Sequence, residues 1–387
     1  MKQKTILVLG TNSGQLDLIK YMKSIDWNVV SCSYRQGEIG EAFSDSFYLV
    51  DIRDIQAVSD LAVKVKADLV YSVSSDVAMT TAVQVSEKLS LPHFYNSDMI
   101  ELFNNKQELR KHLNKYDLGK VEFSIVTEES NALSWSKYPC IVKPTDSQGQ
   151  RGVQKIDSAK KLDEAIKIAQ EISLSNTTIV EEFLDGVEIS CNVLVNKGVI
   201  VFDILSERLV YDGKFMGIPK GHLIPCLNVS LQDQEEALSL VHKIIKSLNI
   251  KNGSLYFQMK VTKTGIKVIE IAPRLDGCHM WRLIENATNN NYLSNTVQTL
   301  LGKCELSKKV TLKNNEMYAL MFQHTPAGRK FFKDDFPIPT NVLYHEYRYK
   351  DNDEITPING RLEVVGYYIR TYLVKDRQNY IEESTDA

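Results

Sequence analysis

The sequence has neither a long apolar run nor a strong charge of one sign. Its 387 residues include 46 Lys and Arg against 49 Asp and Glu, for a formal net charge of −3. This balance gives no general electrostatic basis for binding nucleic acid or a membrane surface. No segment approaches the roughly 20 apolar residues of a membrane span, and the apolar run near the N-terminus is too short for a secretory signal. We therefore expect a cytoplasmic protein without nucleic-acid or membrane partners.

Cysteine pairs and the common glycine-rich nucleotide motifs are also missing. The six cysteines are scattered without a CxxC pair, which is typical of reduced, structural thiols. Neither GxxxxGK[ST] nor GxGxxG occurs. We therefore interpret the turn from Gly10 to Gly14 first as a tight strand-to-helix connection. A site for the second substrate at this helix N-terminus is the alternative.

Apolar runs and amphipathic segments alternate in the N-terminal quarter of the chain. Residues 4–9 form a continuous apolar run, which is typical of a strand buried on both faces. Similar patterns predict strands near 27–31, 46–50 and 68–73 and a helix at 55–65. The alternation predicts a parallel sheet of the Rossmann type over residues 1–97.

The rest of the chain predicts a mixed α/β unit and then a β-rich one. Helices are expected over 98–116, 158–172 and 231–248, and strands near 140–143, 153–156, 178–183, 188–195 and 199–207. A hairpin is expected around 263–265. After Gly302 the sequence is aromatic-rich, with turn signals, which predicts short strands over 303–387.

The stretch Pro139 to Val153 combines a strand, a lysine and a glycine-bearing loop. An apolar strand delivers Lys143, Pro144 ends it, and a polar loop follows. A compact lysine charge can offset phosphate charge, and glycines allow backbone N–H groups to approach phosphate oxygens. Taken alone, such a loop is more often solvated surface.

Two later segments supply carboxylates and an arginine. The segment from Val180 to Glu188 ends a strand with acids and continues past a turn, which suits adenine and ribose recognition. Gln258 and Glu270 lie on the two strands of the expected hairpin and offer hard oxygen ligands for magnesium. Arg274 follows on and can clamp a transferring phosphate.

The order of these elements resembles the ATP-grasp superfamily over about residues 1–302. The resemblance implies an α/β fold with a Rossmann-like parallel sheet at 1–97, an ATP-grasp domain at 98–302 and a β-rich C-terminal unit at 303–387. A mobile lid is implied at about 117–182.

The resemblance also implies a role for each matching residue. Lys106 and Lys143 would contact the ATP phosphates, and Glu188 would hold the ribose. Gln258 and Glu270 would bind magnesium, and Arg274, with Lys143, would serve catalysis. The remaining expected nucleotide contacts are the loop residues Ser147, Gln148, Gly149 and Gly152 and the hinge residues Glu181, Glu182 and Leu184.

Two departures from the family pattern concern the metal and the substrate. Ala272 stands where the family usually has an asparagine ligand, which puts a second metal site in doubt. Asp276-Gly277-Cys278 replaces a Gly-Gly pair that is frequent in the amino-acid ligase branch. Candidate substrate contacts are His222, Asp276, His279 and Arg282, with structural roles as the alternative. Cys278 is interpreted as a packing residue.

The implied activity is a carbon–nitrogen ligase. ATP would convert a substrate carboxylate to an acyl phosphate, an amine would displace phosphate, and ADP would be released. The implied cofactors are ATP and Mg²⁺, with Mn²⁺ as an alternative ion, and relatives suggest a homodimer. A purine-pathway-like or carboxylating enzyme that uses bicarbonate or formate is an alternative. A non-catalytic nucleotide-binding protein is another, and a nicotinamide dehydrogenase is the weakest.

Overall fold

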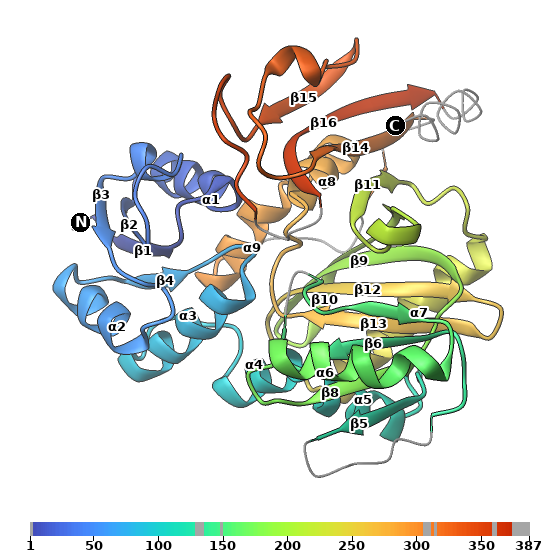
Figure 1. Cartoon of the computed structure of the whole chain (residues 1–387). Helices are drawn as coiled ribbons and strands as arrows, with labels where there is room; N and C mark the ends of the chain where they lie inside the picture. Colours follow the sequence, from blue (N-terminus) through green and yellow to red (C-terminus); the bar gives the residue numbers. More distant parts are fainter. Residues whose placement is uncertain are drawn as a thin grey trace.

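Three sheets organise the part of the chain that the structure describes (Figure 1). The structure is a computed structural model, and it describes residues 3–127, 135–147, 150–304, 311–312, 316–357 and 362–373. Gln148 and Gly149, both expected in the phosphate loop, lie outside the described residues. Within the described residues, no helix has the length and apolar character that crossing a membrane requires.

The N-terminal sheet is parallel, as the alternating sequence predicts. Its strand order is β3-β2-β1-β4. The strands are β1 (Thr5–Leu9), β2 (Asn28–Ser33), β3 (Ser46–Leu49) and β4 (Leu69–Tyr71). The helices of this unit are α1 (Ser13–Ser24), α2 (Ile55–Lys64) and α3 (Asp76–Leu89). Side-chain caps at Asn12, Asp54 and Ser75 satisfy backbone N–H groups at the first turns of these helices.

Two short helices lead from this unit into the rest of the chain. They are α4 (Ser97–Asn104) and α5 (Lys106–Lys115). The Asn105 side chain caps α5 by accepting hydrogen bonds from the N–H groups of Gln107 and Glu108. The cap fixes the start of α5, so that Lys106 and Arg110, one turn apart, share a face of the helix.

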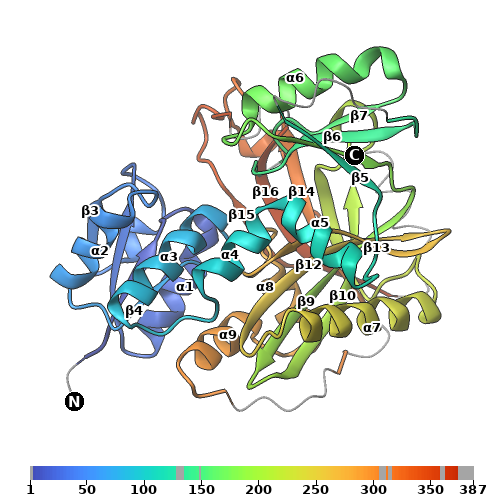
Figure 2. The same ribbon diagram turned by 90° about the horizontal axis from the view of Figure 1, so that it is seen from below.

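A small antiparallel sheet occupies the range in which we expected the lid. Its order is β5-β8-β6-β7. The strands are β5 (Phe123–Val126), β6 (Cys140–Pro144), β7 (Gln154–Ile156) and β8 (Thr178–Glu182). Helix α6 (Leu162–Ile172) covers one face with the buried stripe Leu162, Ala165, Ile166 and Ala169 (Figure 2). This apolar contact gives the small sheet a core of its own.

A large sheet of eight strands forms the rest of the molecule. Its order is β13-β12-β9-β10-β11-β14-β16-β15. The strands are β9 (Gly186–Asn196), β10 (Val199–Val210), β11 (Pro219–Ile224), β12 (Gly253–Thr262), β13 (Gly265–Ala272), β14 (Glu316–Thr325), β15 (Val342–Tyr347) and β16 (Glu363–Leu373). Its helices are α7 (Leu231–Ser247), α8 (Met280–Thr288) and α9 (Tyr292–Leu300). Because β11 pairs with β14, the strands expected after Gly302 extend this sheet.

Helix α8 joins the N-terminal unit to the C-terminal strands through one arginine. Arg282 donates to both oxygens of Asp17 in α1, at 2.6 Å each, and to Glu346 in β15 at 3.0 Å. Its guanidinium also lies 4.0 Å from the ring centroid of Tyr344. Figure 1 shows α8 between these two regions. Arg282 therefore holds three segments of the chain together.

Replacing Arg282 with alanine should destabilise the fold. The change leaves the mostly buried carboxylates of Asp17 and Glu346 without their cation, which costs about 3 kcal/mol. Urea unfolding followed by circular dichroism measures the loss. Arg53→Ala is the matched control, because Arg53 pairs with Asp51 at an exposed site. Equal unfolding midpoints for the two variants would contradict the joining role of Arg282.

Candidate active site

The buried carboxylate of Glu181 connects three segments of the site. Glu181, on β8, accepts from Arg110 Nε at 2.6 Å and lies 2.6 Å from Lys143 Nζ on β6. The other Arg110 nitrogens donate to the carbonyls of Val268 and Ile269 on β13, at 2.7 and 2.9 Å. Burial opposes ionisation of Glu181, but the charges of Arg110 and Lys143 outweigh it and lower its pKa to about 2. The small sheet is thus tied to the strand that carries Glu270.

The two expected phosphate-binding lysines lie beside the start of the loop. The Lys106 ammonium donates to the carbonyl oxygen of Ser147 at 2.6 Å. Lys143 is buried, and because burial removes water from the charged ammonium, it lowers the pKa of this side chain. Gly152 has φ +74°, and a Cβ there would lie 2.9 Å from the Pro144 ring. Glycine therefore lets the end of the loop fold back against Pro144.

Glu188 forms a second buried carboxylate pair on the large sheet. It is ion-paired with Arg208 on β10 and accepts from Gln258 Nε2 at 2.5 Å. Lys260 donates to the carbonyl oxygen of Leu184 at 3.1 Å, at the hinge between β8 and β9. The structure thus gathers the expected hinge and ribose residues where the two sheets meet.

Gln258 and Glu270 are direct cross-strand partners on β12 and β13. Directly opposed residues of an antiparallel pair present their side chains on the same face. Glu270 also lines a pocket with Asp76, Lys106 and Arg110. The two proposed metal ligands therefore lie next to the proposed phosphate-binding residues.

Arg274 is held by a carboxylate from the N-terminal unit. Asp76, the first residue of α3, accepts from both Nε and Nη2 of Arg274, the latter at 2.7 Å. A third nitrogen of Arg274 donates to the carbonyl oxygen of Leu275 at 3.0 Å. This forked contact fixes the plane of the guanidinium.

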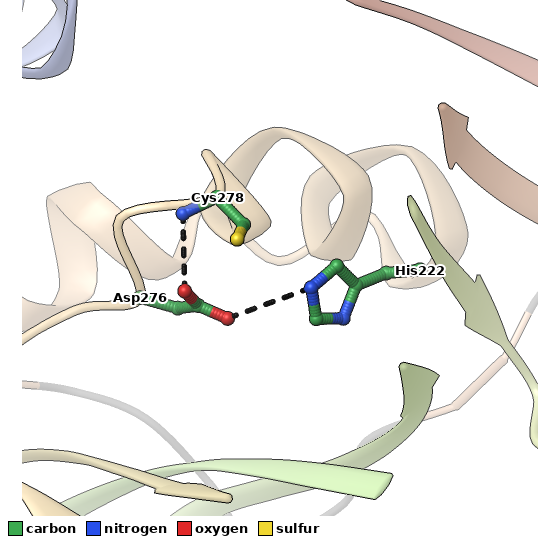
Figure 3. Close-up of side chains that lie close together, drawn as sticks. All are labelled: His222, Asp276 and Cys278. Atoms are coloured by element: carbon green, nitrogen blue, oxygen red, sulfur yellow. Dashed lines mark hydrogen bonds and ion pairs between the residues drawn. The ribbon is translucent and has the colours of Figure 1, made fainter. Parts of the chain in front are cut away.

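His222 and Asp276 come together from β11 and the segment after β13 (Figure 3). His222 Nε2 lies 3.9 Å from Asp276 Oδ2, and Asp276 Oδ1 accepts from the Cys278 N–H at 3.0 Å. Burial, together with the charge of Arg208, keeps the pKa of His222 well below its usual value. Burial raises the pKa of the Asp276 carboxyl. Cys278, expected as a packing residue, is thus part of this polar cluster.

The other two substrate candidates, His279 and Arg282, differ in their contacts. His279 is buried, stacks on Tyr367 at 4.7 Å between centroids, and has its Nε2 3.5 Å from Arg348. His279 thus follows Asp276 closely in the sequence and contacts the C-terminal strand β16 through Tyr367. Arg282 already contacts Asp17 and Glu346, so the structure gives no support to its expected role as a substrate contact.

Two further expectations find little support in the structure. Glu182 accepts from the backbone N–H of Glu122 at 2.8 Å instead of joining Glu181, since neighbouring strand residues face opposite sides. At the turn from Gly10 to Gly14, Thr11 donates to the Glu38 carboxylate at 2.6 Å. An acid beside this turn disfavours an anionic ligand, so the tight-connection interpretation is preferred.

Four residues of the site were missed in the sequence. Arg110 could have been found, because it lies one helical turn after Lys106 on the same face. Asp76, Arg208 and Arg348 gave no such signal, since strand pairing and the placement of α3 bring them in from distant segments.

Comparison with known proteins gives a family match over the middle of the chain. Residues 136–281 match the family described as "ATP-grasp domain". A carbamoyl phosphate synthase large chain of Thermoanaerobacter is 21% identical over 209 residues, which are 53% of this chain and 19% of that protein. The chain thus spans about a fifth of the length of this curated relative.

Solved structures extend the similarity over the whole chain. The L-amino acid ligase from Bacillus licheniformis has a TM-score of 0.82 at 16% identity and covers 100% of this chain and 98% of its own. The N5-carboxyaminoimidazole synthetase from Staphylococcus aureus complexed with ADP has a TM-score of 0.78 at 19% identity, with 100% and 97% covered. The chain therefore has the fold of these structures, and its residues 136–281 match the ATP-grasp domain family.

Replacing Glu181 with glutamine should reduce both stability and its dependence on acid. The folded pKa of about 2 lies below the ordinary 4.5, so the ionised carboxylate stabilises the fold above pH 4.5, and this contribution disappears as the pH falls toward 2. The variant should lose about 3 kcal/mol at neutral pH and show a shallower loss between these pH values. Urea unfolding at a series of pH values measures both effects.

Glu122→Gln is the control, because Glu122 pairs with Lys137 at an exposed position of the same small sheet. If Glu181→Gln and Glu122→Gln followed the same acid profile, the assigned charge on Glu181 would be wrong.

Proposed function

We propose that this protein is an ATP-dependent ligase that phosphorylates a substrate carboxylate and couples the acyl phosphate to an amine, with release of ADP and phosphate. The observation that carries the proposal is one pocket lined by Lys106, Glu270 and Asp76. Asp76 also accepts hydrogen bonds from Arg274. Cations for phosphates, a carboxylate for a metal and an arginine for the transferred group meet there.

The nucleotide is proposed to lie between the small sheet and the large one. Lys106 and Lys143 would neutralise phosphate charge, and Ser147 and Gly152 belong to the loop that would cover it. The hinge at Leu184 and the carboxylate of Glu188 would take adenine and ribose. The similarity to an ADP-bound synthetase supports a nucleotide here.

The donor set fits a magnesium ion. Glu270 offers a hard carboxylate and Gln258 an amide oxygen, and they are cross-strand partners. Ala272 is buried and has no donor atom, so this position adds no ligand. Magnesium at this place would neutralise charge on the transferring phosphoryl group.

The other site residues would contribute to catalysis by positioning the reacting groups and excluding water. Arg274 would place two N–H groups on the oxygens that gain charge as the carboxylate attacks the γ-phosphorus. Asp76 would hold the plane of that guanidinium. The small sheet would exclude water that would otherwise hydrolyse the acyl phosphate.

The first experiment follows ATP by phosphorus NMR with magnesium, the protein, pooled small carboxylates and pooled amines. ADP and phosphate that appear only with these pools would support the ligase. Bicarbonate dependence would instead favour a carboxylating enzyme, for which the similarity to N5-carboxyaminoimidazole synthetase is the supporting observation. AMP and pyrophosphate would contradict the proposal. ATP binding without turnover would favour a non-catalytic binder.

Glu270→Gln should lower kcat by about 1,000-fold while the fold stays intact. The amide removes the negative charge from the metal position, and losses of this size follow the loss of charge stabilisation in a transition state. ADP release measures the rate, and circular dichroism checks the fold. Glu285→Gln, on the outer part of α8, serves as the control. Near-normal activity of Glu270→Gln would refute the metal assignment.

Ala272→Asn should change the magnesium requirement. The new side chain supplies an oxygen where the family usually has one, so ATP turnover should reach half its maximum at a lower magnesium concentration, by about tenfold for 1.4 kcal/mol of added ligation. A magnesium titration at fixed ATP measures the shift. Ala272→Val is the control without a donor atom. An identical titration for Asn and Val would contradict the proposed vacancy in the ligand set.

A further inference from the structure

Two hydrogen-bond acceptors face one another in the buried cluster of Figure 3. His222 Nε2 and Asp276 Oδ2 are 3.9 Å apart, and neither has a hydrogen-bond partner among the described residues. The side chains are 0% and 5% exposed. The separation is too long for a direct hydrogen bond. His222 Nδ1 lies 3.3 Å from Ser206 Oγ. We assign the proton of the neutral imidazole to this nitrogen, which leaves a lone pair at Nε2.

Two facing acceptors require a group that brings hydrogens to both. An ammonium group does so, and its charge suits a carboxylate. A divalent metal is the competing occupant, because the Cys278 sulfur lies with the other two ligand atoms within 4.8 Å. The charge of Arg208, which acts on both His222 and Asp276, opposes an added dication. The surroundings therefore favour a singly charged donor.

A partly buried arginine without an ion-pair partner among the described residues lies near the cluster, where it contacts His279 at 3.5 Å. Arg348 follows β15 directly, and its buried Nε atom has no hydrogen-bond partner. Among the described residues, no carboxylate oxygen lies within 4.0 Å of the Arg348 guanidinium nitrogens. The nearby Glu346 is already engaged by Arg282 and Tyr344. The charge of Glu346 acts on Arg348 but is shared with Arg282. A largely desolvated cation without an acid in contact is costly, so this position suits an anionic ligand.

Cys278 places the two features side by side. Its backbone N–H binds Asp276, and the charges of Asp276 and Arg348 both act on its thiol. The neighbouring His279 contacts Arg348 directly, at 3.5 Å. One short segment, Asp276 to His279, thus connects the acceptor pair to the unpaired guanidinium.

We propose that this cluster binds the nucleophile of the ligase reaction, an amine that carries an anionic group. The ammonium lies between His222 and Asp276, and the anionic group lies on Arg348. The inference rests on the proposed function, which it deepens by naming the chemical class of the amine. It also assigns a binding role to the C-terminal strands.

The chemistry of the step follows from this placement. The ammonium gives one proton to the His222–Asp276 pair, and the freed lone pair forms the C–N bond at the acyl-phosphate carbon. The bond between the acyl carbon and the bridging phosphate oxygen then breaks, and its electron pair leaves with the phosphate. Phosphate takes a second nitrogen proton, and the third stays on the amide.

A binding experiment tests the proposal without turnover. In a calorimetric titration, each amine is added to the whole protein in the presence of MgADP. The amines are alanine, β-alanine and O-phosphoethanolamine, with ethylamine as the amine that has no anionic group. At least one anionic amine should bind 30-fold or more tightly than ethylamine, as expected for a buried charge pair. The carboxylate and phosphate compounds tell which anion is used.

Arg348→Gln should abolish this preference by weakening only the anionic amines. Arg329→Gln, an exposed arginine of the same region, is the control and should behave like the unmodified protein. Asp276→Asn should weaken ethylamine and the anionic amines alike, since it acts on the ammonium. Equal binding of all amines, no binding of any, or an unchanged preference in Arg348→Gln would overturn the proposal. Detection of zinc in the purified protein by metal analysis would also overturn the proposal.

A trapping experiment separates this proposal from the proposed function. Hydroxylamine, a small neutral nucleophile, converts an acyl phosphate to a hydroxamate. Arg348→Gln should form hydroxamate from the carboxylate pool at the normal rate, while the KM for the anionic amine rises 30-fold or more. Absence of hydroxamate in the unmodified protein would refute the acyl-phosphate chemistry, whereas the binding results would still decide the acceptor site.

Discussion

The buried carboxylate of Glu181 is the contact on which the geometry of the site depends. It holds Lys143 on the small sheet and Arg110 on α5, and Arg110 in turn holds two carbonyls of β13. The small sheet, α5 and β13, which are not joined by strand pairing among the described residues, are therefore connected through one anion and Arg110. Each cation is buried, so each needs this carboxylate in its ionised form. The position of the phosphate-binding lysine relative to Glu270 follows from that requirement.

A second set of ion pairs places the N-terminal unit. Asp76 holds Arg274, and Asp17 holds Arg282, so two arginines that follow β13 are both fixed by acids on helices of the N-terminal unit, α3 and α1. A unit that the sequence suggested as a separate α/β fold thus contributes directly to the pocket, where Asp76 is a lining residue. Motion of this unit relative to the large sheet would release or reorient the arginine proposed to act on the phosphoryl group.

Local patterns were sufficient for many of the elements and for part of the site, although α3, β11, α8 and α9 were not predicted. The run at residues 4–9 predicts a strand and gives β1, and the hairpin around Lys263 to Gly265 gives the Gln258–Glu270 pair. These depend on short-range periodicity and turn chemistry, which a single sequence carries. The continuation of the sheet from β11 to β14 was not predicted, because pairing between distant strands leaves no local signal. Arg208 and Arg348 were missed for the same reason, since only that sheet brings them to the cluster.

The pairing of charges explains what a ligand must do on entering the site. Lys143, Arg208 and Arg274 are each matched by one acid of the chain, namely Glu181, Glu188 and Asp76. Phosphates and a metal would therefore redistribute these contacts rather than fill unused ones. Arg348 differs, because no carboxylate of the described residues lies within 4.0 Å of it and its Nε lacks a partner; the charge of nearby Glu346 acts on it, but Glu346 is paired with Arg282. Arg348 is thus a cation of the site without an ion-pair partner among the described residues, and we infer that its counter-charge comes from a ligand.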